Sequence, residues 1–365
     1  MSGKELWQKY IEIPEGHRSI FDFLRVISCI GIIGLHVTGD RTDTLGLFFE
    51  ACFRVALPMF FLLSGVLILT SKKELKIGAF YLNRFEKIGI PMIIYGFYYS
   101  CWINQGHPIL ELPTAQSAAA FVGLMPSAIS WNLAGPQYFH TWFLYEIVGL
   151  YLVMPFLKKG LNAMSDGYLK ALAVVILVMM CCTDYLTAFG QGFWISNYFA
   201  FWIIYPIFGY ILMQEFCRRH YRGIAIAGAV FFIGAFLAKV LFPSFTGRIS
   251  NYYDLAPHMI LTVCGAFALV MLLEKPLTFF RWWNVLMKRL ARYTFGIYLI
   301  HGYIISWWSV HQGTSNGTVY GTLRSVAGVF LLSLLFTLVF DNLITFPLEK
   351  LFHFLTHRKK RQKEE

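Results

Sequence analysis

Long apolar segments follow one another along almost the whole chain, and each is long enough to cross a lipid bilayer. An α-helix of about 20 apolar residues spans the hydrocarbon core of a membrane, where only helices and closed barrels satisfy their own backbone groups. The sequence therefore predicts an all-α, polytopic transmembrane helix bundle of about ten spans. The predicted spans are residues 20–38, 48–70, 88–104, 138–157, 169–188, 197–214, 223–242, 255–274, 292–310 and 322–345.

The lysine and arginine residues lie mainly in alternate connections, which predicts how the bundle is oriented. With the N-terminus in the cytoplasm, 25 of the 31 Lys and Arg residues fall in inside segments, and only Arg41 and Arg248 fall in outside ones. Cytoplasmic connections of membrane proteins carry such an excess. We therefore expect both termini in the cytoplasm, with an N-terminal segment at 1–19, a membrane domain at 20–345 and a basic tail at 346–365.

Composition excludes several other classes of protein. The chain is 57% hydrophobic and only 14% charged, whereas a soluble domain carries roughly 25% charged residues. The net charge of +11 does not indicate a nucleic-acid partner, because the basic residues are dispersed among short connections. The seven cysteines lie mostly in apolar runs and form no C-x-x-C pair, so we expect neither a disulfide framework nor a metal site. The first apolar run lacks a small-residue cleavage site and is expected to be a retained helix.

An arginine and a histidine interrupt the first apolar run. Arg25 and His36 are eleven residues apart, which in an α-helix separates them by ~16 Å along the axis and by only ~20° around it. Asp22 precedes Arg25 by three residues, the spacing of a helical ion pair. Ionisable groups at membrane depth are expensive and usually mark a functional site. We therefore expect this stripe to face a cavity, with His36 able to take up and return a proton.

A second polar group lies near the predicted outer ends of the helices. If these ends converge, they form a vestibule that is open to the outside. Trp142 can stack on a sugar ring there, although a tryptophan at this depth is more often part of the interfacial aromatic belt. His301, inside the segment at 292–310, is equally a functional or a packing histidine. Besides Trp142, the members of this outer group are Asp40, Arg54, His140, Glu146, Asp254 and His258.

Basic residues also cluster on the predicted cytoplasmic side. Arg84 and Lys87 are three residues apart just before the span at 88–104, and Arg292 ends a basic stretch before the span at 292–310. Clustered cations of this kind can bind phosphates. They also report orientation alone in most membrane proteins, and charge does not separate the two interpretations.

Four motifs follow one another along the chain. They are Arg25 with ten intervening residues before His36, the run Phe60 to Gly65, the run Phe139-His140-Thr141-Trp142-Phe143-Leu144, and the run from Thr294 to His301. In this order they resemble the integral-membrane acyltransferase-3 family. The run from Arg54 to Phe61, within the second predicted span, is most similar to the branch that O-acetylates enterobacterial common antigen.

The resemblance implies transfer of an acyl group, usually acetyl, from cytoplasmic acyl-CoA to a glycan hydroxyl, in the inner membrane of a bacterium. It implies that Arg25 and His36 are the functional pair. A cytoplasmic R-x-x-R of the family corresponds to Arg84 through Lys87, where lysine keeps the charge but loses the bidentate fork.

Together these features predict a membrane O-acyltransferase without a bound cofactor or metal, whose donor substrate is acetyl-CoA or another acyl-CoA. His36 is expected to act as a general base on the acceptor hydroxyl or to carry the acyl group itself. Arg25, held by Asp22, is expected to orient the donor or to stabilise developing charge. The donor phosphates are expected near Arg84, Lys87 and Arg292, and the acceptor near Arg54, His140, Trp142, Glu146 and His301.

The acceptor is expected to be a surface glycan or a lipid-linked sugar, and the lipid bilayer is the other expected partner. The main alternative is a transporter or flippase without acyl chemistry, since a polar stripe through a bundle equally suits a permeation path. A lipid-binding or assembly subunit is a third possibility.

Overall fold

The computed structural model describes residues 17–39, 41–72, 74–107, 114–134, 138–186, 188–190, 202–249, 252, 254–313 and 317–361. Every regular element in these ranges is a helix, in agreement with the all-α prediction. Most of the predicted N-terminal segment at 1–19 lies outside the described residues, as does Asp40.

The chain divides into two compact units, each built from separate stretches of sequence. The first unit comprises residues 1–72, 156–295 and 312–328, and the second comprises residues 73–155, 296–311 and 329–365. Three long helices contribute residues to both units. They are α8 (Trp142–Asn162), α16 (Arg281–Gln312) and α17 (Val319–Phe340).

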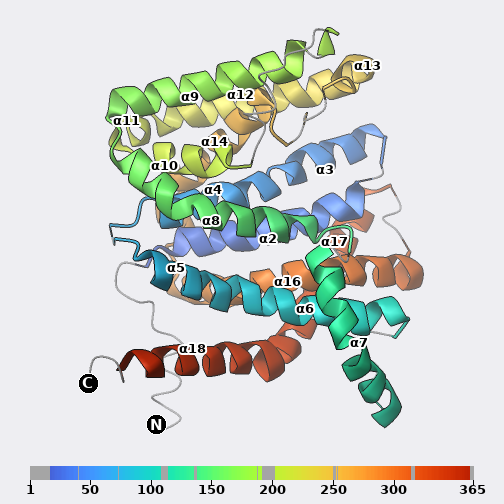
Figure 1. The fold of residues 1–365 in the computed structure, drawn as a ribbon. Coiled ribbons are helices and arrows are strands. Elements are labelled where there is room, and N and C mark those ends of the chain that lie inside the picture. The colour runs from blue at the N-terminus through green and yellow to red at the C-terminus, as the bar shows by residue number, and fades with distance from the viewer. Residues whose placement is uncertain are drawn as a thin grey trace. The chain divides into compact units, whose positions relative to one another are not determined.

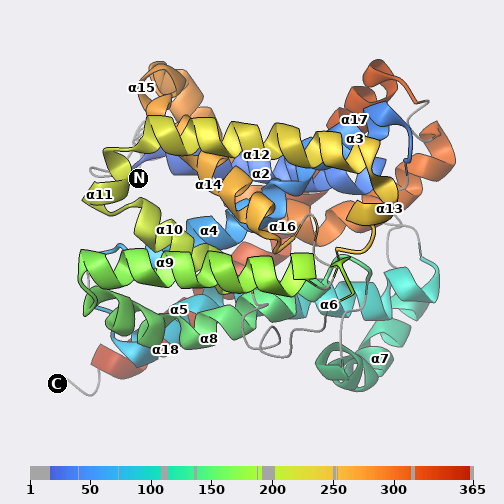
Figure 2. The same ribbon diagram turned by 90° about the horizontal axis from the view of Figure 1, so that it is seen from above.

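In the first unit, neighbouring helices pack along each other in pairs. Helix α12 packs on α14, α10 packs on α4, and α2 packs on both α3 and α4. The α12 and α14 pair can be followed in both ribbon views (Figure 1, Figure 2). Helix α14 begins at a proline, where the missing N–H is not needed. The helices of this unit are α2 (Ser19–Thr38), α3 (Thr44–Arg54), α4 (Ala56–Ile68), α9 (Asp166–Cys181), η3 (Cys182–Leu186), α10 (Ile204–Leu212), α11 (Glu215–Arg218), α12 (Tyr221–Leu241), α13 (Pro243–Thr246), α14 (Pro257–Leu272) and α15 (Glu274–Leu277).

The second unit is built around α6, which packs on α7. Two π-helical turns interrupt its α-helices, one between α5 and α6 and one between α17 and α18. Single π-helical turns of this kind are rare and are frequent at functional sites. The remaining helices of this unit are α5 (Ile77–Arg84), η1 (Phe85–Gly89), α6 (Ile90–Cys101), η2 (Ile103–Gln105), α7 (Ala115–Ala134), η5 (Asp341–Thr345) and α18 (Phe346–Arg361).

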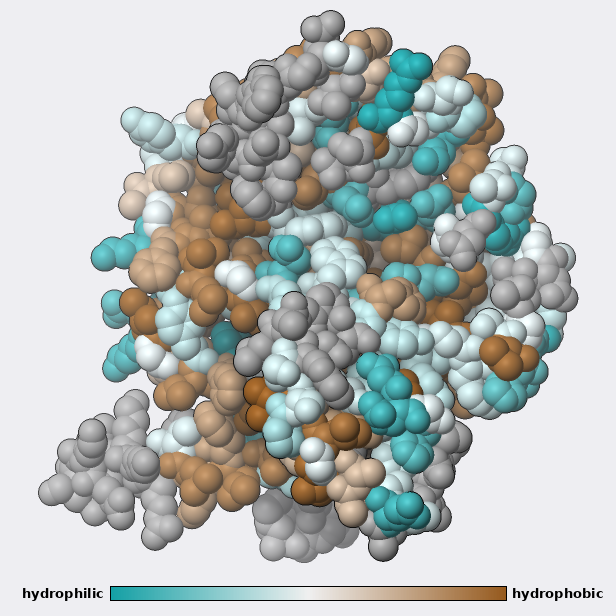
Figure 3. All heavy atoms as spheres, turned by 45° about the vertical axis from the view of Figure 1, so that its right-hand side comes forward, coloured by the Kyte–Doolittle hydropathy of each residue, from teal (hydrophilic) through white to brown (hydrophobic). Residues whose placement is uncertain are grey.

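Five helical stretches of the described residues are long and apolar enough to cross a membrane. Helix α12 shows most clearly that their outer surfaces suit lipid, because Ile226 is 66% exposed and Val230 is 62% exposed. Hydrophobic side chains, drawn brown, cover broad areas of the face shown in Figure 3. The five stretches are Ser19–Thr38, Thr44–Ile68, Asp166–Leu186, Tyr221–Leu241 and Val319–Thr356.

Four of these stretches match predicted spans to within a few residues at each end. The fifth runs from Val319 to Thr356, whereas the predicted span is 322–345. The helix therefore continues through residue 346, where the basic tail is predicted to begin. Its side chains at Leu351 and Phe354 are still more than half exposed, so its apolar surface extends into that predicted tail.

Candidate functional site

The first-unit helix α2 carries a buried carboxylate, Asp22, that contacts two basic side chains. Asp22 is 3% exposed, and its Oδ1 lies 3.6 Å from Nη1 of Arg25, the pairing that the spacing predicts. Its other oxygen, Oδ2, lies 2.5 Å from Nε2 of His17. His17 was not among the predicted residues, because it precedes the helix and no helical spacing points to it. The Arg25 side chain itself remains 40% exposed.

At the other end of α2, His36 is half-buried, and the charge of Arg54 acts on its imidazole. The packing of α2 on the following helix accounts for this proximity. Gly34 leaves room for the ring of Phe53, since a Cβ on Gly34 would lie 2.6 Å from that ring. Phe53 directly precedes Arg54, the last residue of α3. One close contact between two helices therefore brings together His36 and Arg54, which the sequence assigns to different groups.

Two carboxylates hold the guanidinium of Arg54. Its Nη2 lies 3.2 Å from Oε1 of Glu50, one turn earlier on α3, and its Nη1 lies 3.4 Å from Oδ1 of Asp254, just before α14. The backbone carbonyl of Asp254 in turn accepts a hydrogen bond from the hydroxyl of Tyr205. Burial raises the pKa of the Asp254 carboxyl above its ordinary value, although Arg54 opposes this shift. The predicted convergence of Arg54 and Asp254 is thus present, with Glu50 as a partner that was not predicted.

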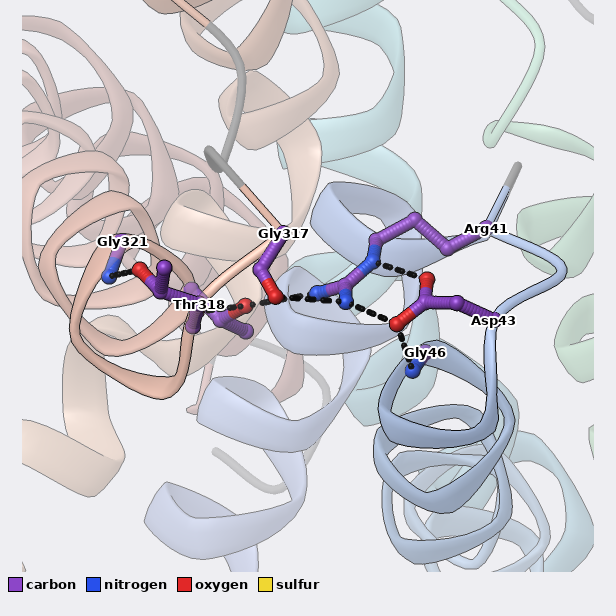
Figure 4. Close-up of polar contacts among 7 residues, drawn as sticks. Arg41, Asp43, Gly46, Gly317, Thr318 and Gly321 are labelled. Carbon is purple, nitrogen blue, oxygen red and sulfur yellow. Dashed lines mark hydrogen bonds and ion pairs between the residues drawn. The ribbon is translucent and has the colours of Figure 1, made fainter.

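The turn between α2 and α3 is fixed by Arg41, as Figure 4 shows. Its Nε lies 2.8 Å from Oδ1 of Asp43, and its Nη2 lies 3.1 Å from the carbonyl oxygen of Gly317. A further bond of 3.1 Å joins Nη1 to the hydroxyl of Thr322. Asp43 also caps α3 by accepting from the backbone N–H of Gly46, and the Arg41 hydrogen bond lowers the pKa of the Asp43 carboxyl below its ordinary value. This turn sets the position of α3, and hence of Arg54, relative to α2.

His258 is the remaining member of the predicted outer group in this unit. Its described ring contacts are with two tyrosines. Its Nδ1 lies 2.9 Å from the hydroxyl of Tyr185, and its ring stacks on that of Tyr185 and is tilted against that of Tyr252. These contacts are those of a packed histidine at the start of α14.

In the second unit, His140 and His301 form a buried pair. They are 1% and 0% exposed, and their ring centroids are 4.5 Å apart. Nε2 of His140 lies 3.1 Å from the carbonyl oxygen of Leu299, and Nδ1 of His301 lies 2.5 Å from that of Tyr298. The Tyr298 hydroxyl donates to the carbonyl of His140. Two imidazoles this close cannot both carry a charge without strong repulsion.

The other two predicted acceptor residues of this unit are on α8, which begins just after His140. Trp142 is half-buried, and Glu146 is exposed. The half-buried position of Trp142 is compatible with both of its predicted roles, and the Glu146 side chain is exposed whereas the rings of His140 and His301 are buried. A small pocket opens beside the pair, lined by Met92, Tyr95, Gly96, Tyr99, Asn132, Thr141, Leu144, Tyr145 and Leu299.

A buried carboxylate of the second unit was missed by the sequence analysis. Asp341 is 4% exposed, and its Oδ1 accepts a 2.9 Å hydrogen bond from the hydroxyl of Tyr95. It begins the π-helical turn η5. Gly296 on α16 lies so close that a Cβ there would be 2.6 Å from Oδ2 of Asp341. The signal was available, because Asp341 is an ionisable residue inside a predicted span, as Arg25 is.

The predicted phosphate-binding cations differ in their surroundings. The guanidinium of Arg84 lies over the rings of Phe80 and Tyr151, at 5.3 and 5.4 Å from their centroids. Lys87 is paired with two carboxylates, Glu86 and Glu349. Arg292 is exposed on α16, in the part of that helix that belongs to the first unit. The sequence predicts no partner for Lys87, because Glu349 is distant along the chain.

Within the described residues, no group of three or more His, Cys, Asp or Glu side chains is arranged to hold a metal ion. A family model of the acyltransferase domain, that of the acyltransferase-3 family, matches residues 18–341. The match includes both ends of the polar stripe on α2. No curated protein and no solved structure matches the chain.

Proposed function

Since this chain belongs to the integral-membrane acyltransferase-3 family, we propose that it moves an acetyl group from cytoplasmic acetyl-CoA to a hydroxyl of a surface or lipid-linked glycan. Family membership supports acyl transfer by a membrane protein. The observation that carries the more specific proposal is the arrangement along α2, with Arg25 and Asp22 paired at one end and His36 beside the charge of Arg54 at the other.

In the proposed reaction, His36 takes the proton of the acceptor hydroxyl while that oxygen attacks the carbonyl carbon of the thioester. The carbon–sulfur bond then breaks, and the CoA thiolate receives the proton from His36. A positioned general base contributes ~10²–10⁴ in rate. The guanidinium of Arg54 would stabilise the negative charge that develops on the carbonyl oxygen, as preorganised donors do in acyl transfer.

Arg25 has a different proposed role, because it lies ~16 Å from His36 along the helix axis. At this distance it would hold the pantetheine arm of the donor on its way to His36. The Asp22 carboxylate would fix the Arg25 guanidinium in that position. The donor phosphates would lie on the cytoplasmic side, where Arg84, Lys87 and Arg292 are the candidate contacts.

The proposed topology is that of ten spans in the inner membrane of a bacterium, with both termini in the cytoplasm and the membrane domain at 20–345. The acceptor would approach from the outer side, where His140, Trp142, Glu146 and His301 are the candidate contacts. Trp142 supports this assignment, because its ring is half-buried at the start of α8 and aromatic rings with a few polar groups are typical of ligand sites.

The proposal is tested by acetyl transfer from radiolabelled acetyl-CoA, with purified protein in nanodiscs and a panel of candidate glycans. We expect His36→Ala to lose at least ~10²-fold in rate while it elutes and unfolds like the unmodified protein. His220→Ala is the matched control, since His220 is exposed and bonds only to a nearby carbonyl in its recorded contacts.

Full activity of His36→Ala would remove His36 from the reaction. Movement of a glycan across the membrane without any acetyl turnover would instead support the transporter alternative. In the absence of a glycan, radiolabel on the protein that hydroxylamine releases and that His36→Ala lacks would favour an acyl-histidine intermediate over direct transfer.

A further inference from the structure

Lys87 lies in a cluster of charged side chains in the second unit. Its Nζ is 2.8 Å from Oε2 of Glu349 and 3.1 Å from Oε1 of Glu86. Nδ1 of His353 lies 3.0 Å from the other oxygen of Glu86. These four residues, the Lys87 cluster, connect the π-helical turn η1 with α18, which are in contact.

The two carboxylates of the Lys87 cluster are buried, whereas its cation is not. Glu86 and Glu349 are each 7% exposed, but the Lys87 side chain is 51% exposed. Burial raises the pKa of Glu86, yet the hydrogen bonds from His353 and Lys87 outweigh this and hold it below its ordinary value. Burial likewise opposes charge on Lys87, but Glu349 and Glu86 raise its pKa overall. Glu86 and Lys87 are therefore both charged near neutral pH.

Two carboxylates beside one ammonium change what that ammonium can bind. A phosphate that approached Lys87 in this arrangement would meet more negative than positive charge, and like charges repel strongly at short range. The lysine side chain has a flexible four-carbon stem with rotatable donors, so it can turn from Glu349 toward a phosphate. When it does so, Glu86 keeps His353 as a partner, whereas Glu349 loses the ion pair that it makes in this structure.

We infer that Glu349 is a positioning residue that holds Lys87 away from the donor phosphates, so that acyl-CoA binds Lys87 only by displacing Glu349. This inference rests on the proposed function, because acyl-CoA is the phosphate-bearing ligand. Arg84 makes the first phosphate contact in this scheme, since it lies one turn earlier and its recorded partners are aromatic rings. Glu349 thereby sets the affinity for the donor without touching the reacting atoms.

The test is equilibrium binding of radiolabelled acetyl-CoA to the full chain in nanodiscs. We expect Glu349→Gln to tighten binding by about threefold to fivefold, the range of a half-exposed ion pair, and Lys87→Gln to weaken it by a similar factor. Glu349→Gln should have no effect in the Lys87→Gln background, because the two residues act as a unit. Glu215→Gln is the matched control, since it breaks an exposed pair with Arg219 in the first unit.

Two results would overturn the inference while leaving the proposed function intact. One is unchanged affinity in Glu349→Gln together with lowered thermal stability in both single variants, which would make the Lys87 cluster a structural tether. The other is equal tightening by Glu349→Gln in the presence and absence of Lys87, which would mean that the carboxylate acts by its own charge. If the unmodified chain transfers no acetyl group and binds no acetyl-CoA, both proposals fall together.

Discussion

At the scale of single residues, the recorded contacts assign partners to the ionisable groups that the sequence places inside the membrane. Asp22 is shared by Arg25 and His17, and Arg54 is shared by Glu50 and Asp254. Charges that are removed from water are costly unless they are paired. These carboxylates therefore explain how α2 and α3 carry arginines within predicted membrane spans. The pairs also fix where each cation points.

Replacement of Arg25 by lysine tests whether the guanidinium geometry matters. Lysine keeps the charge beside Asp22 but presents a single ammonium in place of a planar fork. If Arg25 holds the donor arm, Arg25→Lys should raise the KM for acetyl-CoA at least ~10-fold, since a lost charged hydrogen bond is worth ~1.5–3 kcal/mol. Steady-state kinetics in nanodiscs measure this effect, and an unchanged KM would show that positive charge alone suffices.

Gly296 tests the packing around the buried carboxylate of Asp341. A Cβ at this position would lie 2.4 Å from Cγ2 of Thr337 and 2.6 Å from Oδ2 of Asp341. Because the core around it cannot expand freely, Gly296→Ala should destabilise the protein by ~1–3 kcal/mol. Gly234→Ala on α12 is the control, since no atom lies within 4 Å of a Cβ there. Thermal unfolding in nanodiscs compares the two, and equal midpoints would contradict the described packing.

At the scale of elements, the apolar pattern predicts helices well and their irregularities poorly. The expected spans at 20–38 and 223–242 correspond to Ser19–Thr38 and Tyr221–Leu241, because a long apolar run in lipid has few alternatives to a helix. The π-helical turn at Asp341–Thr345 was not expected, since it leaves the apolar composition unchanged. Its position depends on contacts with other helices, such as the bond between Tyr95 and Asp341.

In the site, a contact between residues close in sequence was predicted, whereas two contacts between residues far apart in sequence were not. The Asp22 and Arg25 pair follows from a spacing of three residues and was predicted. The pair of Lys87 with Glu349 joins residues 262 positions apart, and one sequence carries no signal for such a contact. The contact between the rings of His140 and His301 was not predicted either, because these residues are also far apart along the chain.

The turn between α2 and α3 makes a prediction about pH. Its Arg41 hydrogen bond lowers the pKa of Asp43 from the ordinary value of 3.8, so the stabilisation is present above that value and is lost as the pH falls through the lower folded pKa. We expect the unfolding temperature of the unmodified protein to exceed that of Asp43→Asn at about pH 5, and the difference to shrink as the pH falls below 3.8. A difference that did not shrink below this pH would contradict the role of the carboxylate charge.

At the scale of the whole molecule, orientation in the bilayer is the feature that decides where donor and acceptor meet the protein. The charge distribution predicts that Arg41 and Arg248 are outside and that Lys158 and Arg218 are inside. The described spans are compatible with insertion as a helix bundle, and the family match covers residues 18–341. In the proposed function, the direction of acyl transfer would follow from this orientation.

The predicted topology is tested by single cysteines placed in a cysteine-free variant and labelled with an impermeant maleimide in intact cells. We expect labelling at Thr42 and Ser244, near the two outside arginines, and no labelling at Ser165 or His220 until the membrane is opened. Retained acetyl transfer by each variant confirms that its fold is intact. Labelling of His220→Cys in intact cells would reverse or shift the proposed arrangement of spans.

The shared carboxylate of Asp22 has a consequence for the stretch of chain that leads into the first span. His17 and Arg25 contact different oxygens of the Asp22 side chain. A shift of His17 would therefore move the carboxylate that holds Arg25, even if no residue of the transmembrane helices were replaced. If Arg25 holds the donor as proposed, shortened or tagged versions of this protein that disturb residue 17 would lose affinity for acetyl-CoA even when every transmembrane helix is intact.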